Sequence, residues 1–433
     1  MKINPPRGMR DLLPEDLAKR RYVEDCIRRL FKLYGYDEVE TPTLESYELL
    51  AAKVGEETRR AMYIVEDLKG RRYALRPEGT SPIARLVVSK FKAYPKPIRL
   101  GYIWDFYRYD EPQFGRYRRF YQGGFELIGS PTIEADVEIL SIAVHLFRML
   151  DIPSFYMKMN HVGILRSLLS HYGFGESVQN HILFLADKKR YDELVEFLVD
   201  LKAPDKLVDT VSEIIKLRGF DIHSVIDKAR IVLKDYSEAL LSLERLESIL
   251  NLMLKLNSDV KILVDLGFGR GLEYYTGMIF EVFVEGVDIA LAGGGRYDKL
   301  IEFYGGEPTP AVGFSPGIDR IVSVMEKLGI LPEIDHERLL LVVPASDRYS
   351  SDALTVSHQI RSKGVPAVTE VNMRKLKDSL SYADKMRFRY VAIIGEEYKD
   401  GLIVLRDMKA RSQISITLDR LIEILEESIP CRG

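Results

Sequence analysis

Several segments of the sequence place arginine side chains among glycines, where a bound anion would find both charge and space. The most distinctive is KILVDLGFGRGLEYYTGMIFEV (residues 261–282), in which Arg270 is followed by Tyr274 and Tyr275. A guanidinium group stays charged and offers a rigid set of N–H donors that suits phosphate and carboxylate groups. A tight β-bulge or hairpin would explain the glycines, but it would leave the arginine unexplained.

The same glycines invite comparison with the Gly-x-Gly-x-x-Gly turn of dinucleotide-binding folds. That turn must open a helix, because the pyrophosphate rests on the helix N-terminus. Counting from Gly267, the third glycine position holds Leu272, and residues 274–283 are rich in β-formers. We therefore expect a strand after this loop, which disfavours a nicotinamide-dependent enzyme.

A second segment, WDFYRYDEPQFGRYRRFYQGGFELIG (residues 104–129), combines aromatic residues with several charges. Its alternation predicts two antiparallel strands, the first including Arg108 and Asp110, joined by the loop 111–118. Gln122 and Glu126 would then share one face of the second strand, with a glycine between them. If the opposite face packs on the core, an amide and a carboxylate face a cavity that a ligand or another backbone approaches closely. A solvated hairpin is the structural alternative.

Two further segments carry charge at helix openings. Glu78 and Thr80 precede a helix that starts near Ser81, and they could bind an ammonium group or simply cap the helix. Arg320 follows a strand-to-helix junction at residues 313–317, in a helix expected to bury apolar side chains including Leu328. An arginine near the positive end of a helix opposes the macrodipole, so it more plausibly points at an anion.

Composition limits the class of protein. The chain has 433 residues, 46% hydrophobic and 29% charged, with a formal net charge of -3, so nucleic acid binding would need a local patch. We see no apolar run that could span a bilayer and no signal-peptide core at the start. The two cysteines, Cys26 and Cys431, lie far apart and form no disulfide or metal framework, which favours a reduced cytoplasm.

The pattern of elements predicts an α/β (α+β) chain of several parts. Residues 1–170 mix strands, helices and glycine-rich turns, whereas residues 171–256 repeat apolar residues at three- and four-residue steps, as a small all-α insertion would. Residues 257–328 return to the first style. Residues 337–433 alternate strands and helices, which predicts a separate α/β domain.

Taken in order, the charged segments resemble the signature motifs of class II aminoacyl-tRNA synthetases. YGYDEVETPTLE (residues 34–45) is similar to motif 1, YRYDEPQ…GRYRRFYQGGFE to motif 2, and AVGFSPGIDRI to motif 3. GRGLEYYTGMIFE and AGGGRYDKL resemble the two motifs of the histidine-specific enzymes. The C-terminal hundred residues resemble the anticodon-binding domain of one class II subgroup. The chain thus resembles the histidyl-tRNA synthetase family, whose catalytic domain is built on an antiparallel sheet with flanking helices.

The resemblance implies a two-step reaction. The histidine carboxylate attacks the α-phosphate of ATP, pyrophosphate leaves, and histidine then moves to the terminal ribose of tRNA(His). Arg108 and Arg270 would grip the α-phosphate from two sides, and the glycines beside Arg270 would let the backbone come close. The resemblance also implies ATP accompanied by Mg²⁺, no protein side chains that bind a metal with certainty, no membrane, and a homodimer formed through motif 1.

Further roles carry over position by position. ATP would be bound by Arg108, Asp110, Arg116 and Arg320. L-histidine would be bound by Glu78, Thr80, Gln122, Glu126, Tyr274 and Tyr275, with Glu126 and Tyr275 at the imidazole ring. The tRNA would meet Gln113 and Arg118 in the motif 2 loop, and Arg374, Lys377 and Arg387 in the C-terminal domain.

Two positions depart from the family pattern. Glu111 stands where bacterial members often carry arginine, and Glu273 replaces the usual aspartate before the tyrosine pair. Two alternatives stay open within the resemblance. A catalytically inactive regulator of histidine biosynthesis would typically lack the anticodon domain and the full arginine set, and another class II synthetase of the same subgroup would use a different amino acid.

Overall fold

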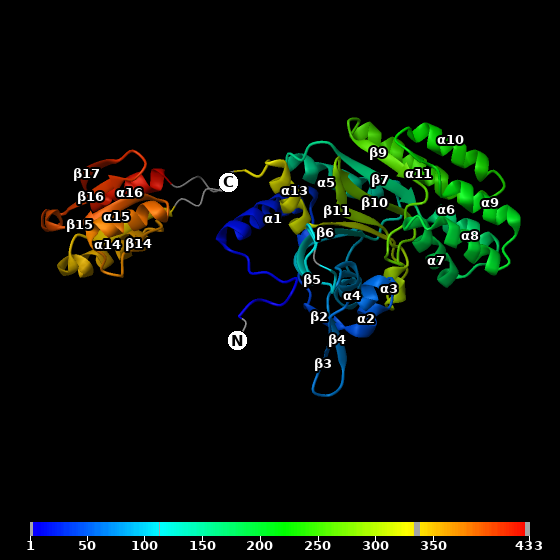
Figure 1. Ribbon diagram of the computed structural model, residues 1–433, viewed down its shortest axis with the longest axis horizontal. Coiled ribbons are helices and arrows are strands. Elements are labelled where there is room, and N and C mark those ends of the chain that lie inside the picture. Colours follow the sequence, from blue (N-terminus) through cyan, green and yellow to red (C-terminus); the bar gives the residue numbers. More distant parts are fainter. Residues whose placement is uncertain (1–2, 112, 333–337, 429–433) are drawn as a thin grey trace. The chain divides into compact units, whose positions relative to one another are not determined.

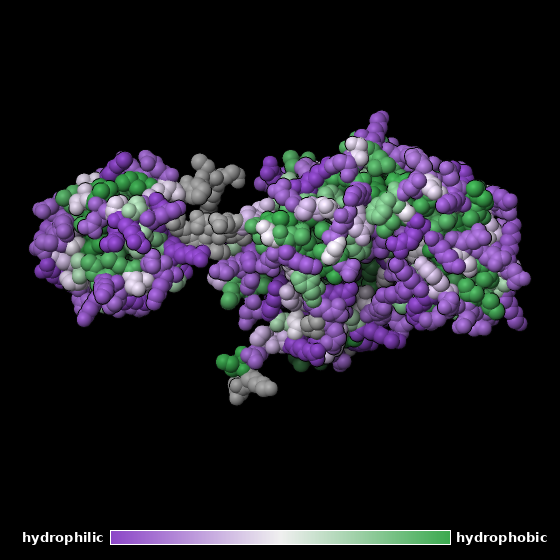
Figure 2. All heavy atoms as spheres, turned by 45° about the horizontal axis from the view of Figure 1, so that its top comes forward, coloured by the Kyte–Doolittle hydropathy of each residue, from purple (hydrophilic) through white to green (hydrophobic). Residues whose placement is uncertain are grey.

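The computed structural model describes residues 3–111, 113–332 and 338–428, and it divides into two compact units, residues 1–332 and 333–433 (Figure 1). Residues 337 and 429–433 of the expected C-terminal domain, including Cys431, lie outside the described residues. On the visible face of each unit, hydrophilic residues predominate and apolar ones are scattered between them (Figure 2). None of the helices in the described ranges combines the length and apolar character that crossing a bilayer requires.

The first unit is built on a nine-stranded sheet. Its pairs are antiparallel except β1 with β5 and β7 with β9, so the expected antiparallel sheet forms the centre. In spatial order the strands are β1 (Asp37–Glu38), β5 (Ile98–Tyr107), β6 (Arg119–Ile128), β12 (Ala311–Pro316), β11 (Val287–Arg296), β10 (Met278–Val284), β7 (Phe155–His161), β9 (Lys261–Asp265) and β8 (Arg218–Gly219). A smaller sheet holds β2 (Leu44–Ser46), β4 (Arg72–Leu75) and β3 (Ile64–Glu66).

Helices cover this sheet and fix its strands. The helices outside the insertion are α1 (Pro14–Tyr34), α2 (Tyr47–Ala51), α3 (Glu56–Arg60), α4 (Thr80–Lys90), α5 (Ile133–Met149), α12 (Leu300–Phe303) and α13 (Ile318–Leu328). Helices α1 and α13 pack on each other and against β6, while α5 packs against β12 and β11. Helix α13 buries Ile321, Val324 and Met325 as expected, but Leu328 at its end is exposed, because the helix stops there at a left-handed Gly329.

The helical insertion (residues 171–256) is helical as expected, apart from one short strand (Figure 1, green). Its helices, together with α6 (Gly163–His171) before it, are α7 (Glu176–Asp187), α8 (Tyr191–Asp200), α9 (Asp205–Ile214), α10 (Ile222–Val232) and α11 (Ser237–Leu256). The strand β8 pairs with β9 and so covers the edge of the large sheet. Two residues give no periodic pattern, so this strand is invisible in the sequence. Helix α11 returns to the main fold and packs on α5 and α6.

The second unit is a five-stranded sheet with helices on both faces. Its elements are β13 (Arg338–Pro344), η1 (Asp347–Tyr349), α14 (Ser350–Ser362), β14 (Val368–Thr369), α15 (Leu376–Lys385), β15 (Phe388–Ile394), η2 (Glu396–Asp400), β16 (Leu402–Asp407), β17 (Ser412–Thr417) and α16 (Leu418–Glu427). Alternate residues of β13 enter different cores, Leu340 beside α14 and α16, and Leu341 beside α15. This burial on both faces explains the continuous apolar run of β13.

Candidate active site

The antiparallel pair β5 and β6 carries most of the side chains expected at the site. β5 ends at Tyr107, so Arg108 and Asp110 lie in the connecting segment and not in a strand, and the expected strand limit was wrong. The backbone N–H of Arg108 still donates to the carbonyl oxygen of Arg118, at 2.9 Å, and that of Tyr109 donates to the carbonyl oxygen of Ala61, at 2.7 Å. The side chain of Arg108 reaches the turn before α4, where its Nε donates to the carbonyl oxygen of Pro77 at 2.8 Å.

Strand β6 packs one face on α1 and turns the other toward the site, as its alternation predicts. The rings of Phe125 and Phe31 lie 4.7 Å apart on the α1 side, and Glu126 lies on the opposite face. The glycine on that face has a role other than the one expected. A Cβ atom on Gly124 would lie 2.0 Å from the ring of Tyr102, so a neighbouring side chain, and not a ligand, needs the space.

Glu126 lies at the centre of a buried polar cluster. Its side chain is 1% exposed, and it accepts hydrogen bonds from the hydroxyl of Thr80, at 3.0 Å, and from the hydroxyl of Tyr297. Burial raises the pKa of Glu126 to about 8; the charge of Glu78 adds to the rise, and the two hydrogen bonds oppose it. The carboxyl therefore holds its proton at neutral pH in the free protein.

Glu78 serves the helix cap and the polar cluster together. Its carboxylate accepts from the backbone N–H of Thr80, at 2.7 Å, and of Ser81, at 3.0 Å, at the start of α4. The hydroxyl of Tyr274 donates to the same carboxylate at 3.4 Å. Burial raises the pKa of Glu78, and the hydrogen bonds from Ser81 and Thr80 limit that rise. Glu78 thus caps the start of α4, as one interpretation of the sequence proposed, and it also belongs to the polar cluster around Glu126.

Three tyrosines surround the two carboxylates. The ring of Tyr274 lies 4.8 Å from that of Tyr275 and 5.9 Å from that of Tyr297, and all three are buried. Tyr297 is not among the residues that the motif resemblance assigns to histidine, although it lies in the quoted AGGGRYDKL. Tyr297 directly follows β11, which ends at Arg296. This position in the sequence is the feature that could have placed its side chain near Glu126.

Three buried or half-buried arginines are each anchored by one N–H group to a backbone carbonyl oxygen. The anchors are Arg108 to Pro77 (2.8 Å), Arg270 to Phe280 (3.1 Å) and Arg320 to Ala290 (2.8 Å). A guanidinium has five N–H donors in a fixed plane, so each anchor sets the orientation and leaves donors for a bound anion.

The arginines lie close enough to repel one another. Burial lowers the pKa of Arg320 to about 10, with Arg116, Arg108 and Arg270 adding to the effect. Burial also lowers the pKa of Arg108, which Asp110 and Glu78 oppose and Arg270 reinforces. Arg116 is exposed, in a turn that lies against Arg320. A bound polyanion would relieve this repulsion, so the cluster is suited to a triphosphate.

Arg270 belongs to a connecting segment, the arginine loop (residues 266–277), that leads into strand β10 and not into a helix. The dinucleotide-binding interpretation is therefore excluded. Its side chain crosses β11 at Gly293, where a Cβ atom would lie 1.6 Å from Nη1. Burial lowers the pKa of Arg270, but Tyr275 and Glu281 outweigh it, so that the pKa is raised. The guanidinium of Arg270 therefore keeps its positive charge, and it lies close enough to Arg108 and Tyr274 to interact with them electrostatically.

Comparisons with known proteins agree on one family. The histidyl-tRNA synthetase family model matches residues 8–321, and the anticodon binding domain model matches residues 340–428. The histidine–tRNA ligase of Methanocaldococcus jannaschii is 39% identical over 96% of this chain and 98% of its own length.

The chain belongs to the histidyl-tRNA synthetase family. Its activity is that of a histidine–tRNA ligase, which uses ATP to attach histidine to tRNA. Among solved structures, histidyl-tRNA synthetase from Nostoc sp. PCC 7120 shares the fold, with a TM-score of 0.76 at 24% identity over 99% of this chain and 100% of that one. A Bacillus halodurans chain titled ATP phosphoribosyltransferase regulatory subunit/histidyl-tRNA synthetase has a TM-score of 0.74 at 26% identity, covering 91% of this chain and 98% of that one.

Within this family the motif 2 loop is expected to meet tRNA, and the structure separates its two candidates. Gln113 is exposed and forms a turn with Arg116. Arg118 is only 6% exposed, and its guanidinium lies 3.7 Å from the centroid of the Tyr109 ring and donates to the carbonyl oxygen of Asp110. We therefore do not retain Arg118 as a tRNA contact, because its side chain holds the loop together.

In the anticodon-binding unit the three candidate residues also differ. Arg374 donates to Glu370 at 2.6 Å and lies over the ring of Tyr382, so its charge is already paired. Lys377 and Arg387 are exposed. Only these two offer freely accessible charge to a phosphate backbone.

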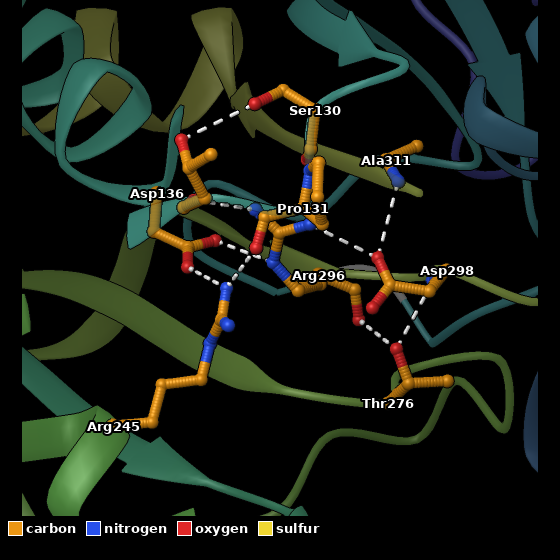
Figure 3. Close-up of polar contacts among 9 residues, drawn as sticks. Ser130, Pro131, Asp136, Arg245, Thr276, Arg296, Asp298 and Ala311 are labelled. Atoms are coloured by element: carbon orange, nitrogen blue, oxygen red, sulfur yellow. Dashed lines mark hydrogen bonds and ion pairs between the residues drawn. The ribbon is translucent and has the colours of Figure 1, made fainter. Parts of the chain in front are cut away.

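A buried ionic network supports the histidine-specific motifs from behind (Figure 3). Asp136 of α5 accepts from Arg296 of β11, at 2.7 Å, and from Arg245 of α11, at 3.1 Å. The carbonyl oxygen of Arg296 accepts from the backbone N–H of Thr276, at 2.8 Å, and Asp298 donates its own N–H to the Thr276 hydroxyl at 3.0 Å. The network thus ties the tyrosine pair before Thr276 to the strand that precedes Tyr297.

Arg270 and Tyr275 line a cavity of about 720 Å³, which Asn180 and Leu183 of α7 also line. A second cavity of about 1000 Å³ is lined by Tyr274, Tyr275 and other residues. In residues 3–111, 113–332 and 338–428, no group of three or more His, Cys, Asp or Glu side chains is arranged to hold a metal ion.

Proposed function

We propose that this histidine–tRNA ligase forms histidyl-adenylate between the guanidinium groups of Arg108 and Arg270, beside a polar pocket around Glu126. The observation that carries the proposal is the gathering of Arg108, Arg270 and Arg320, each anchored to a backbone carbonyl oxygen by one N–H group, in one site where Arg108 and Arg270 both lower the pKa of Arg320. A site that gathers several cations whose N–H donors are only partly used fits a highly charged substrate.

In the first step a carboxylate oxygen of histidine attacks the α-phosphorus, and the bond from that phosphorus to the bridging oxygen of pyrophosphate breaks. Negative charge builds on the α-phosphoryl oxygens, so positioning and electrostatic stabilisation dominate catalysis. Arg108 and Arg270 supply fixed positive charge there. Arg320, Arg116 and Asp110 bind the rest of the nucleotide, which enters as the Mg²⁺ complex of ATP.

Histidine recognition follows from donors and acceptors. A neutral imidazole presents one donor and one acceptor, so Glu126 in its ionised form accepts from one ring nitrogen and the hydroxyl of Tyr275 donates to the other. Glu78, Thr80 and Gln122 hold the α-amino group. Tyr297 holds Glu126 in place, and Tyr274 does the same for Glu78. An apolar amino acid would leave these buried groups unpaired and is rejected strongly.

The second step transfers histidine to tRNA(His). We also propose that the protein is a homodimer and that it acts in the cytoplasm. Gln113 meets the acceptor end, while Lys377 and Arg387 contact the phosphate backbone near the anticodon. Leu33, 58% exposed at the end of α1, and Leu44, 40% exposed in β2, provide apolar surface in and beside the segment that resembles motif 1. Sedimentation equilibrium of the full chain decides this point, since a monomer at micromolar concentration contradicts it.

ATP–pyrophosphate exchange with each amino acid in turn tests the proposal. Exchange with histidine alone is expected, and it should fall about 10²- to 10³-fold in Arg108→Ala and in Arg270→Ala. Lys228→Ala, which removes an exposed cation on α10, serves as a control with activity close to that of the wild type. Near-normal exchange in Arg270→Ala contradicts the proposed role of that guanidinium.

A further inference from the structure

The arginine loop contacts the helical insertion at two of its glycines. A Cβ atom on Gly267 would lie 2.4 Å from the carbonyl oxygen of Ile215, which follows α9. A Cβ atom on Gly269 would lie 3.0 Å from the carbonyl oxygen of Leu183 in α7. Backbone atoms cannot rotate aside as a side chain can, so the approach of the insertion requires glycine at both positions. Gly267 and Gly269 therefore accommodate the insertion, whereas a Cβ atom on Gly271 would meet no atom within 4 Å.

Asp187, the last residue of α7, bonds to the loop directly. Its carboxylate accepts from the backbone N–H of Gly269 at 3.1 Å, one residue before Arg270. Burial raises the pKa of Asp187 to about 6; this hydrogen bond opposes the rise, and the charge of Glu281 adds to it. The hydrogen bond from Gly269 opposes that rise because it favours the ionised carboxylate, which is the stronger acceptor.

Other contacts hold the rest of the loop backbone. The side-chain amide of Asn160 donates to the carbonyl oxygens of Leu266, at 3.2 Å, and of Phe268, at 2.7 Å. The backbone N–H of Gly55 donates to the carbonyl oxygen of Gly271 at 3.1 Å. Two of these fixed points, Gly269 and Gly271, are adjacent to Arg270, and the insertion holds the one on the N-terminal side.

We propose that Asp187 is a positioning residue for Arg270, and that the helical insertion thereby forms part of the adenylation site. The proposal rests on the role proposed above for Arg270. Asp187 touches no reacting atom. It fixes the backbone from which the guanidinium reaches across β11 to Phe280, so a movement of α7 displaces the charge that faces the α-phosphate.

The test uses the full chain and steady-state ATP–pyrophosphate exchange. Asp187→Ala is expected to lower kcat about tenfold or more, because small misplacements of a catalytic group carry large rate effects, and to leave the KM for histidine unchanged. Asp187→Asn should regain most of that loss, since its amide oxygen can accept the same N–H bond. Asp209→Ala, an exposed carboxylate on α9 of the same insertion, is the control and should match the wild type.

A double-mutant cycle with Arg270→Ala separates positioning from general destabilisation. In the Arg270→Ala background, Asp187→Ala should cause no further fall in residual exchange. An equal fall in both backgrounds, or wild-type kcat in Asp187→Ala, overturns the positioning role while leaving Arg270 in place. Near-normal exchange in Arg270→Ala overturns the role of Arg270 itself. Should Asp187→Ala unfold at the assay temperature, Asp187→Ala and Asp187→Asn are compared at a lower temperature at which both are folded.

Discussion

Replacing Gly293 by alanine is expected to inactivate the site through Arg270 alone. The new Cβ atom would lie 1.6 Å from Nη1 of Arg270, and ordinary contact begins at 3.4 Å, so the guanidinium must retreat by about 1.8 Å. The three nearest atoms all belong to the far end of this one side chain, so the strand itself can stay in place.

The size of the effect follows from that displacement. A 1 Å misplacement of a catalytic group can cost about 10²-fold in rate, and loss of one donor to a developing oxyanion costs about 10²- to 10³-fold. We therefore expect kcat for histidine-dependent ATP–pyrophosphate exchange to fall by about 10²- to 10³-fold in Gly293→Ala. The KM for histidine should change little, because no contact of Glu126 is altered.

A double-mutant cycle provides the decisive measurement. If Gly293→Ala acts only by moving Arg270, it should have no effect in an Arg270→Ala background. Gly175→Ala, where no atom lies within 4 Å of the new Cβ, is the matched control and should leave activity unchanged, with only a small fall in melting temperature because Gly175 is the N-cap of α7. Near wild-type exchange in Gly293→Ala, or an additive loss in the double variant, would refute the placement of Arg270.

Three further predictions concern the histidine pocket and its support. Because the pKa of Glu126 is raised to about 8 and histidine binding requires the ionised form, the KM for histidine should fall as the pH rises from 7 through 8, and it should level off about one pH unit above that pKa. The dependence should vanish in Glu126→Gln, and a flat wild-type profile counts against the assignment. Tyr297→Phe removes a hydrogen bond to that carboxylate, so it should raise the KM for histidine about tenfold with kcat for ATP-saturated exchange nearly unchanged; an unaltered KM would exclude the contact. In the buried network, Arg296→Ala should lower the free energy of unfolding, measured with urea, by about 3–5 kcal/mol, because Asp136 would be left buried with a single partly exposed partner. Arg245→Ala should lower it by only about 1–2 kcal/mol. Equal losses in the two variants would contradict this division.

The sequence by itself determined features that depend on local pattern. The alternation around Glu126 already predicts that this carboxylate faces away from Phe125, because successive side chains of a strand point to opposite sides. The β-formers after Arg270 exclude a dinucleotide-binding helix for a similar reason. In the second unit, the apolar run from Leu340 predicts a strand buried on both faces, since a polar residue at either face would have no water.

The tertiary structure decided what depends on segments distant in the chain. The carbonyl oxygen of Pro77 anchors the side chain of Arg108 from a segment about thirty residues earlier in the chain, and no local signal reports such a partner. The glycines before Arg270 make room for backbone atoms of the insertion. The buried guanidinium of Arg118 lies over the ring of Tyr109, a residue of the same connecting segment. Burial is the main cause that raises the pKa of Glu126, with the charge of Glu78 adding to it. Both causes depend on packing, which one residue and its neighbours in sequence do not determine.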